Sequence, residues 1–403
     1  MRKIVYWLSL VLIFTIAWEG LVRFPGIGTL AKLAGLVLAV CWAGTVVATG
    51  RLRRPDPFLL ATFVFVTWNA VSVLWSLAPR VSALHVFTWV QSFGLVLILW
   101  DVFRTRTAIQ AGLQAYVLGA YVAVGGAIAN YFGSNPFYAN YDRFSPGATN
   151  PDGFAFIIAL GIPVAWYLAS TSGTVRWRRL LRLLDFAFIP AAFVGLALAG
   201  TRTAAVAGIV GMAFGLASLT RLRPVARIAI LAILTYAFFA LLPVVQPLAS
   251  FQRLGTTAAE ATEGDLNGRL AQWRQGLDSF HEHPLVGVGA NMYRTVNTLG
   301  KEAHNSFVSV LVELGLIGLV LFGIVLAIVV FHAFHQPSKW DRNFWVTVLA
   351  VWALGASTLT WEHRKTTWVF LTLLVASAAT VPRPERVPQA VRTVPPTPAL
   401  ARG

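Results

Sequence analysis

The residues best suited to chemistry lie in one polar stretch, from Leu248 to Ala303, and at the start of the apolar segment that follows it. Apolar residues recur at three- and four-residue steps from Leu270 to Phe280, the pattern of an amphipathic helix on a membrane or over a cavity. Arg269 comes at the predicted start of this helix, behind Asn267, a residue that can cap it. A guanidinium beside a positive helix end suits a diphosphate. An arginine that faces water is the alternative interpretation.

His304 stands where the polar stretch gives way to the apolar run HNSFVSVLVELGLIGLVLF. Asn305 can cap the helix predicted to begin there. Near neutral pH an imidazole can take a proton from a hydroxyl nucleophile, so His304 is the candidate general base. Its neighbours Glu302 and Asn305 are candidate substrate-binding residues. An interfacial histidine without a chemical role is the alternative.

The remaining histidines of the polar stretch do not form a zinc motif. His281 and His283 occur in HEHPLVGVGANMY, which lacks the i, i+4 histidine spacing of H-E-x-x-H. We therefore predict that both are surface or packing residues, and we predict no metal site.

Arg202 lies in LALAGTRTAAVA, between two segments rich in small residues. The flanking Gly200, Thr201 and Thr203 allow the backbone to approach an anion, which the guanidinium would hold with two parallel hydrogen bonds. The alternative is that Arg202 extends to lipid phosphates.

Charged residues inside apolar segments are costly in lipid and commonly mark a pathway or a site. Glu19 and Lys32 fall in the first two apolar segments, and we predict an ion pair between them. Glu313 follows His304 by two to three helical turns, and both a packing role and a catalytic role are open.

The composition is that of a polytopic membrane protein. Of 403 residues, 57% are hydrophobic and only 12% are charged. The single cysteine, Cys41, can close no disulfide within the chain. The first apolar run has no signal-peptide cleavage site, so we interpret it as an uncleaved span. Windows of about 20 apolar residues predict about twelve transmembrane helices, near 4–22, 28–49, 57–78, 81–102, 108–133, 153–171, 180–199, 203–220, 225–247, 304–334, 343–361 and 366–381.

Lysine and arginine alternate from loop to loop in a way that predicts the orientation. Positive residues gather at the amino terminus, in the loops near 51–54, 104–106, 176–182, 221–227 and 339–342, and in the tail. Positive charge stays on the cytoplasmic side, which places both termini inside and the polar stretch outside. The net charge of +16 then reflects topology and contact with anionic lipids, and does not indicate nucleic acid. The predicted units are transmembrane helices one to nine (1–247), an outer loop (248–303), helices ten to twelve (304–381) and a disordered Pro-rich cytoplasmic tail (382–403).

Five motifs in order resemble one known family. RFSPGATNPDGFAFIIA, GTRTAA, NGRLAQW, HPLVGVGANMY and AHNSFVSVLVELGLIGLVLF are similar to segments of the O-antigen ligase and polymerase superfamily of bacterial envelope glycosyltransferases. Each motif is loose alone, but their order and spacing are specific. They run from about residue 143 to residue 322, and the predicted topology fits the rest of the chain.

The resemblance implies an all-α protein with a large helical periplasmic loop before the tenth span and an architecture like that of the GT-C glycosyltransferases. It implies a ligase that moves polysaccharide from undecaprenyl diphosphate to a sugar hydroxyl of lipid A-core, at the periplasmic face of the inner membrane, without nucleotide, cofactor or metal. By motif it assigns the catalytic role to His304 and diphosphate binding to Arg269 and Arg202, and it matches Arg143 to a family position of less defined role.

Two alternatives stay open within the superfamily, namely an O-antigen polymerase and a protein O-oligosaccharyltransferase. From another class, a transporter or flippase would also have many spans and intramembrane charge. Such a protein is expected to contain two related halves, and the sequence has no such repeat.

Overall fold

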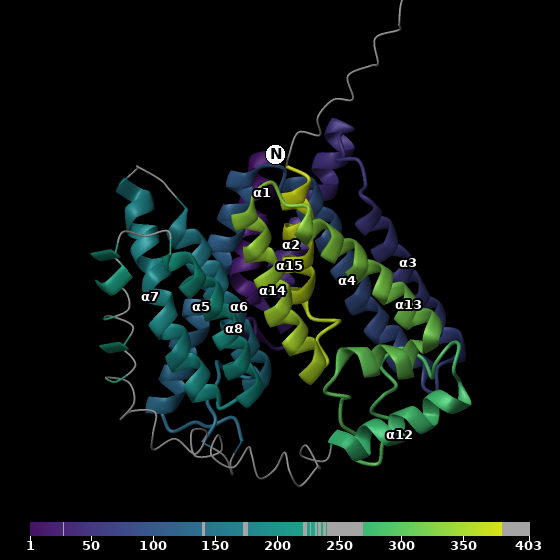
Figure 1. Cartoon of the computed structure of the whole chain (residues 1–403). Coiled ribbons are helices and arrows are strands. Elements are labelled where there is room, and N and C mark those ends of the chain that lie inside the picture. Colours follow the sequence, from purple (N-terminus) through teal and green to yellow (C-terminus); the bar gives the residue numbers. More distant parts are fainter. Residues whose placement is uncertain are drawn as a thin grey trace, which may run out of the picture.

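The computed structural model describes residues 1–26, 28–138, 142–171, 176–220 and 269–380, together with a few positions between 224 and 239. Helices form almost all of its regular structure (Figure 1). Two short antiparallel strands, β1 (Arg23–Phe24) and β2 (Gly28–Thr29), connect the first two helices. The helices are α1 (Arg2–Ile16), α2 (Leu30–Thr49), α3 (Pro57–Val71), the 3-10 helix η1 (Ser72–Trp75), α4 (Pro79–Val102), α5 (Arg106–Phe132), α6 (Pro151–Ser170), α7 (Arg176–Ala199), α8 (Arg202–Leu219), α12 (Arg269–Glu282), α13 (Ser306–Phe334), α14 (Lys339–Thr358) and α15 (Lys365–Ala378).

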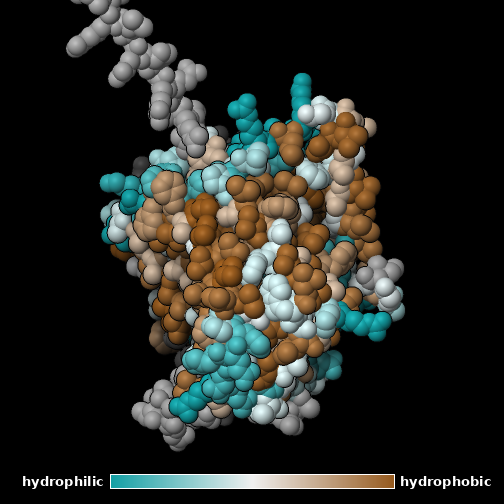
Figure 2. Space-filling view, turned by 90° about the vertical axis from the view of Figure 1, so that its right-hand side faces the viewer, coloured by the Kyte–Doolittle hydropathy of each residue, from teal (hydrophilic) through white to brown (hydrophobic). Residues whose placement is uncertain are grey.

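The predicted class, an all-α polytopic membrane protein, is confirmed. Seven helical segments of the described chain are long and apolar enough to cross a membrane. Eleven of the predicted spans contain a helix. Helix α1 ends at Ile16 and α3 at Val71, six and seven residues before the predicted ends, and the other boundaries agree to within four residues. Most of the 225–247 span, the first part of the predicted outer loop and the predicted tail lie outside the described residues. Hydrophobic side chains cover the middle of the molecule, and hydrophilic ones lie toward its ends (Figure 2).

Helix α6 forms the centre of one half of the bundle. Its side chains are almost entirely buried, and it packs against α5, α7, α8 and α14. Tyr116 of α5 donates a hydrogen bond to the backbone oxygen of Ile157, at 2.8 Å. The loop before α6 and the turn between α7 and α8 are therefore held on a rigid base at one end of the bundle.

Helix α12 lies across the end of the bundle, beside the start of α13 (Figure 1). The sequence predicted this amphipathic helix, and that prediction is confirmed; its described part begins at Arg269. The predicted cap residue Asn267 lies outside the described part of the chain.

A break in α13 was not predicted. Gly315 has φ 68° and ψ −169°, which interrupts the helix, and the segment 284–289 inserts at this point. The N–H of Gly289 donates to the backbone oxygen of Glu313 at 2.8 Å, and the N–H of Leu316 donates to the backbone oxygen of Pro284 at 2.9 Å. These bonds satisfy backbone groups that the break releases. Gly287, at φ 70°, is also required, since an added Cβ would lie 2.4 Å from the Glu313 carbonyl carbon.

Candidate active site

A cavity of about 1110 Å³ opens at the end of the bundle on which α12 lies. Its lining comes from segments far apart in sequence: the residues after α1, the loop before α6, the turn between α7 and α8, the start of α12, the loop before α13 and the turn before α15. The cavity brings together five of the six residues that the sequence singled out, namely Arg143, Arg202, Arg269, Glu302 and His304.

Arg269 presents a guanidinium without a counterion. It has no hydrogen bond or ion pair with any described residue, although it is largely withdrawn from solvent. Burial lowers its pKa, and the charge of Asp152 opposes that shift only in part. An arginine remains protonated even so. This charge lies at the amino-terminal end of the described part of α12 and lines a cavity, so the position is suited to a bound anion.

His304 is held by its backbone and leaves its ring free to react. It lies in the left-handed region at φ 49°, and its N–H donates to Thr360 Oγ1 at 3.2 Å. Its ring atom Nδ1 is buried and has no hydrogen-bond partner among the described residues. Burial lowers the pKa of His304, the charge of Arg269 lowers it further, and Glu302 opposes the shift. The ring is therefore neutral at neutral pH and able to accept a proton.

Direct contacts fix α12 relative to His304. Trp273 Nε1 donates to the backbone oxygen of Ala303 at 2.7 Å, and Tyr293 donates its hydroxyl to the backbone oxygen of Gln272 at 2.8 Å. The helix that carries Arg269 is thus tied to the residue just before the histidine. The two candidate catalytic groups are positioned by one rigid unit.

The side chain of Asn305 is used at the start of α13. Its side chain caps α13, accepting hydrogen bonds from the N–H groups of Phe307 and Val308 at 2.9 and 3.1 Å. It does not line the cavity. The predicted cap is confirmed, and this role occupies the oxygen that would otherwise contact a substrate.

Arg143 holds two loops together. Its Nε donates to the backbone oxygen of Ala199 at 2.7 Å, and its terminal nitrogen contacts both Asp152 and the Thr201 hydroxyl. Asp152 in turn accepts a hydrogen bond from Thr201 at 2.9 Å. These contacts fix the turn that carries Arg202, which also lines the cavity. Arg143 is therefore placed to position Arg202.

The cavity contains more positive charge than the sequence had suggested. Lys365 pairs with Glu19 at 2.6 Å, so the predicted pair of Glu19 with Lys32 is wrong. The first helix meets the turn before α15, and a contact across that distance in sequence leaves no local pattern. Five further basic residues line the same space: Arg23, Arg294, Lys301, Arg364 and Lys365.

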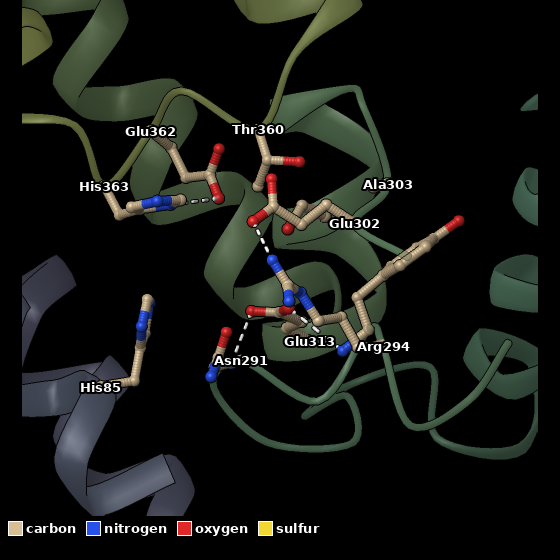
Figure 3. A pocket seen from close by; sticks show the side chains of 11 residues that line it. His85, Asn291, Arg294, Glu302, Ala303, Glu313, Thr360, Glu362 and His363 are labelled. Atoms are coloured by element: carbon tan, nitrogen blue, oxygen red, sulfur yellow. Dashed lines mark hydrogen bonds and ion pairs between the residues drawn. The ribbon is translucent and has the colours of Figure 1, made fainter. Parts of the chain in front are cut away.

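A small polar pocket lies next to the cavity and shares Arg294, Glu302 and Thr360 with it (Figure 3). Arg294 forms an ion pair with Glu302 there. Burial opposes ionisation of Glu302, yet Arg294 and nearby positive groups hold its pKa below the usual range. Glu313 accepts backbone hydrogen bonds from Asn291 at 2.7 Å and from Tyr293 at 3.1 Å. These bonds support a packing role for Glu313.

The other polar residues of the loop lie away from the cavity. His281 and His283 are exposed, as the sequence predicted, and Arg274 faces solvent from α12. Across the described ranges, no three His, Cys, Asp or Glu side chains are arranged to hold a metal ion.

Comparisons with known proteins point to the same family as the motifs. A family model described as O-antigen ligase matches residues 186–323, a range that contains Arg202, Arg269 and His304. The chain is also similar to the exopolysaccharide production protein ExoQ of Rhizobium meliloti strain 1021, with 24% identity over 299 residues. That alignment covers 70% of this chain and 66% of the relative, just under two thirds of its length.

Proposed function

We propose that the chain is a membrane glycosyltransferase of the O-antigen ligase and polymerase superfamily, which moves a glycan from a lipid diphosphate to a sugar hydroxyl. One observation carries the proposal. Arg269, whose half-buried guanidinium has no partner among the described residues, and His304, whose ring atom Nδ1 has none, line the same cavity. The first suits a leaving diphosphate, and the second suits a hydroxyl that must lose its proton.

The reaction is a single displacement at the anomeric carbon. The acceptor oxygen forms a bond to this carbon as the bond to the diphosphate oxygen breaks. The acceptor proton passes to His304, and the electron pair of the broken bond stays with the diphosphate. Arg269 and Arg202 stabilise the negative charge that grows there, a contribution worth roughly a hundred- to a thousandfold in rate for one such group. One displacement inverts the anomeric centre.

The donor in this proposal is a polysaccharide on undecaprenyl diphosphate, and the acceptor is lipid A-core. Basic residues outnumber acidic ones in the cavity lining, which supports an anionic donor and an anionic acceptor. Because arginines neutralise the leaving group, no metal is required for that step.

The proposed setting is the bacterial inner membrane, with the cavity facing the periplasm and both termini in the cytoplasm. The alternating lysine and arginine content of the loops supports this orientation. A phosphatase reporter that is active only in the periplasm should be active when fused at Thr298, which lies at the cavity end. It should be silent when fused at Arg104, in the loop between α4 and α5. The reverse result would overturn the orientation.

A second candidate is a polymerase that joins two lipid-linked glycans. The similarity to a protein named for exopolysaccharide production favours this reaction, in which the acceptor hydroxyl belongs to a second carrier-linked glycan. The same residues would serve it, since only the acceptor differs.

Complementation separates the two reactions. The gene would be expressed in a strain that lacks its O-antigen ligase and, in parallel, in a strain that lacks its polymerase. We expect long glycan attached to lipid A-core in the first strain. Chain extension confined to the second strain would establish the polymerase instead. Activity in neither strain, with the protein inserted in the membrane, would count against both candidates. His304→Ala is the inactive control.

A further inference from the structure

Gln272 is a buried polar residue that the mechanism does not use. It lies three residues after Arg269 on α12 and lines the same cavity, and its side chain is only 3% exposed. Its oxygen Oε1 is buried and receives no hydrogen bond from any described residue. The burial of Gln272 was not predicted, because the expected helix pattern marked only apolar residues for burial.

The backbone around Gln272 is fixed. The Tyr293 hydroxyl donates a hydrogen bond to the Gln272 backbone oxygen, and Nε1 of the neighbouring Trp273 donates one to the Ala303 backbone oxygen. The helix therefore cannot rotate to bring Oε1 to another donor within the protein. A buried carbonyl oxygen without a donor destabilises a fold, and a methionine would fill similar space without that cost. The missing donor is thus expected on a molecule that enters the cavity.

The chemical class of the group that would donate a hydrogen bond to Gln272 Oε1 follows from the amide oxygen and its position. Oε1 only accepts hydrogen bonds, so its partner carries an O–H or N–H group. An ionised diphosphate offers acceptor oxygens alone, and it cannot be that partner. Side chains three residues apart share a helix face, roughly 5–6 Å apart at Cβ. A group that follows the diphosphate held at Arg269 would therefore reach Gln272.

We infer that Gln272 recognises a hydrogen-bond donor, a hydroxyl or an amide N–H, on the sugar joined directly to the donor diphosphate. This inference rests on the proposed function, because it takes Arg269 as the diphosphate site. Gln272 is then a specificity residue for the first sugar of the donor, and it does not take part in bond making or breaking. A site built to pair with such a group rejects a donor that lacks it.

Binding of four lipids to the purified full-length protein in nanodiscs tests the inference. The probes are undecaprenyl diphosphate alone and the same lipid carrying glucose, galactose or N-acetylglucosamine. We expect at least one sugar-bearing probe to bind the wild type more tightly than the bare carrier. Gln272→Met should weaken binding of that probe by roughly 10- to 100-fold. The affinity of the Gln272→Met protein for bare undecaprenyl diphosphate should stay within about twofold of the wild-type affinity.

Gln275→Met is the matched control on the same helix. Gln275 contacts Thr298 on the protein surface and does not line the cavity, so this variant should bind all four probes normally. Arg269→Met should weaken binding of all four.

Each contrary outcome has its own meaning. If the wild type binds no lipid diphosphate, the proposed function itself fails. If it binds the bare carrier as tightly as every sugar-bearing probe, or if Gln272→Met weakens all probes alike, the role in sugar recognition is wrong. A Gln272→Met protein with normal donor binding and a raised KM for the acceptor would assign Gln272 to the acceptor, which also overturns the inference.

Discussion

Replacing Arg269 should make the protein less active and more stable at once. Arg269 is largely buried and has no ion pair or hydrogen bond with the described residues. In the absence of substrate its charge opposes folding, because desolvation of the guanidinium is not offset by a partner. In the transition state the same charge stabilises the leaving diphosphate. Arg269→Met removes both effects.

The expected magnitudes differ in sign and size. Loss of one preorganised charge donor lowers kcat by about 10²- to 10³-fold, or roughly 2.7–4 kcal/mol of transition-state stabilisation. The free energy of unfolding should rise by roughly 0.5–2 kcal/mol, the usual size of a single stabilising change. Arg269→Lys keeps a charge and loses the planar fork, so its rate should also fall strongly.

Arg274→Met is the matched control. Arg274 lies on the same helix and faces solvent, so its loss should change stability by less than about 0.5 kcal/mol and leave transfer intact. Transfer between purified donor and acceptor lipids, with thermal unfolding in the same detergent, measures both effects. Arg269→Met with near-normal turnover would refute the leaving-group role. A destabilised Arg269→Met would show that the guanidinium has a structural partner and would refute the unpaired charge.

Three further results are expected. His304→Ala should lower transfer by about 10²- to 10⁴-fold while donor binding persists, and the control His281→Ala should remain active. Near-normal turnover of His304→Ala would exclude His304 as the base. The acid limb of kcat/KM reports neutral His304, so activity falls as pH drops through its pKa. Glu302→Gln should move this limb to lower pH, and Lys301→Met should move it slightly to higher pH, because the two charges act on the His304 pKa in opposite directions. Shifts of the same sign at both positions would contradict that assignment. Transfer should survive EDTA, and strict dependence on a divalent ion would argue against arginine as the neutralising group.

Patterns of residues close together in the sequence were sufficient to predict most of the described helices and to identify the main candidate site residues. Runs of apolar residues predicted the helices of the described chain, because a segment in lipid must satisfy its own backbone hydrogen bonds. The amphipathic helix that carries Arg269 and the cap at Asn305 were also predicted, because both depend on residues only a few positions apart along the chain.

Contacts between distant segments were decided by the tertiary structure. The Arg143 side chain, a candidate for substrate binding, is occupied by Asp152, Thr201 and Ala199. Glu19 meets Lys365 because α1 and the turn before α15 converge on the cavity. Spacing within a segment cannot show which side chains from other helices will meet it.

The sequence alone determined which segments form apolar helices, which residue caps α13, and which family the motifs resemble. Each of these depends on neighbours along the chain. The tertiary structure decided that Arg269 would be left without a counterion, that His304 would keep a free ring nitrogen and that Gln272 would be buried beside them. Whether a polar atom finds a partner depends on how separate helices pack, and that packing is set by side chains far apart in sequence.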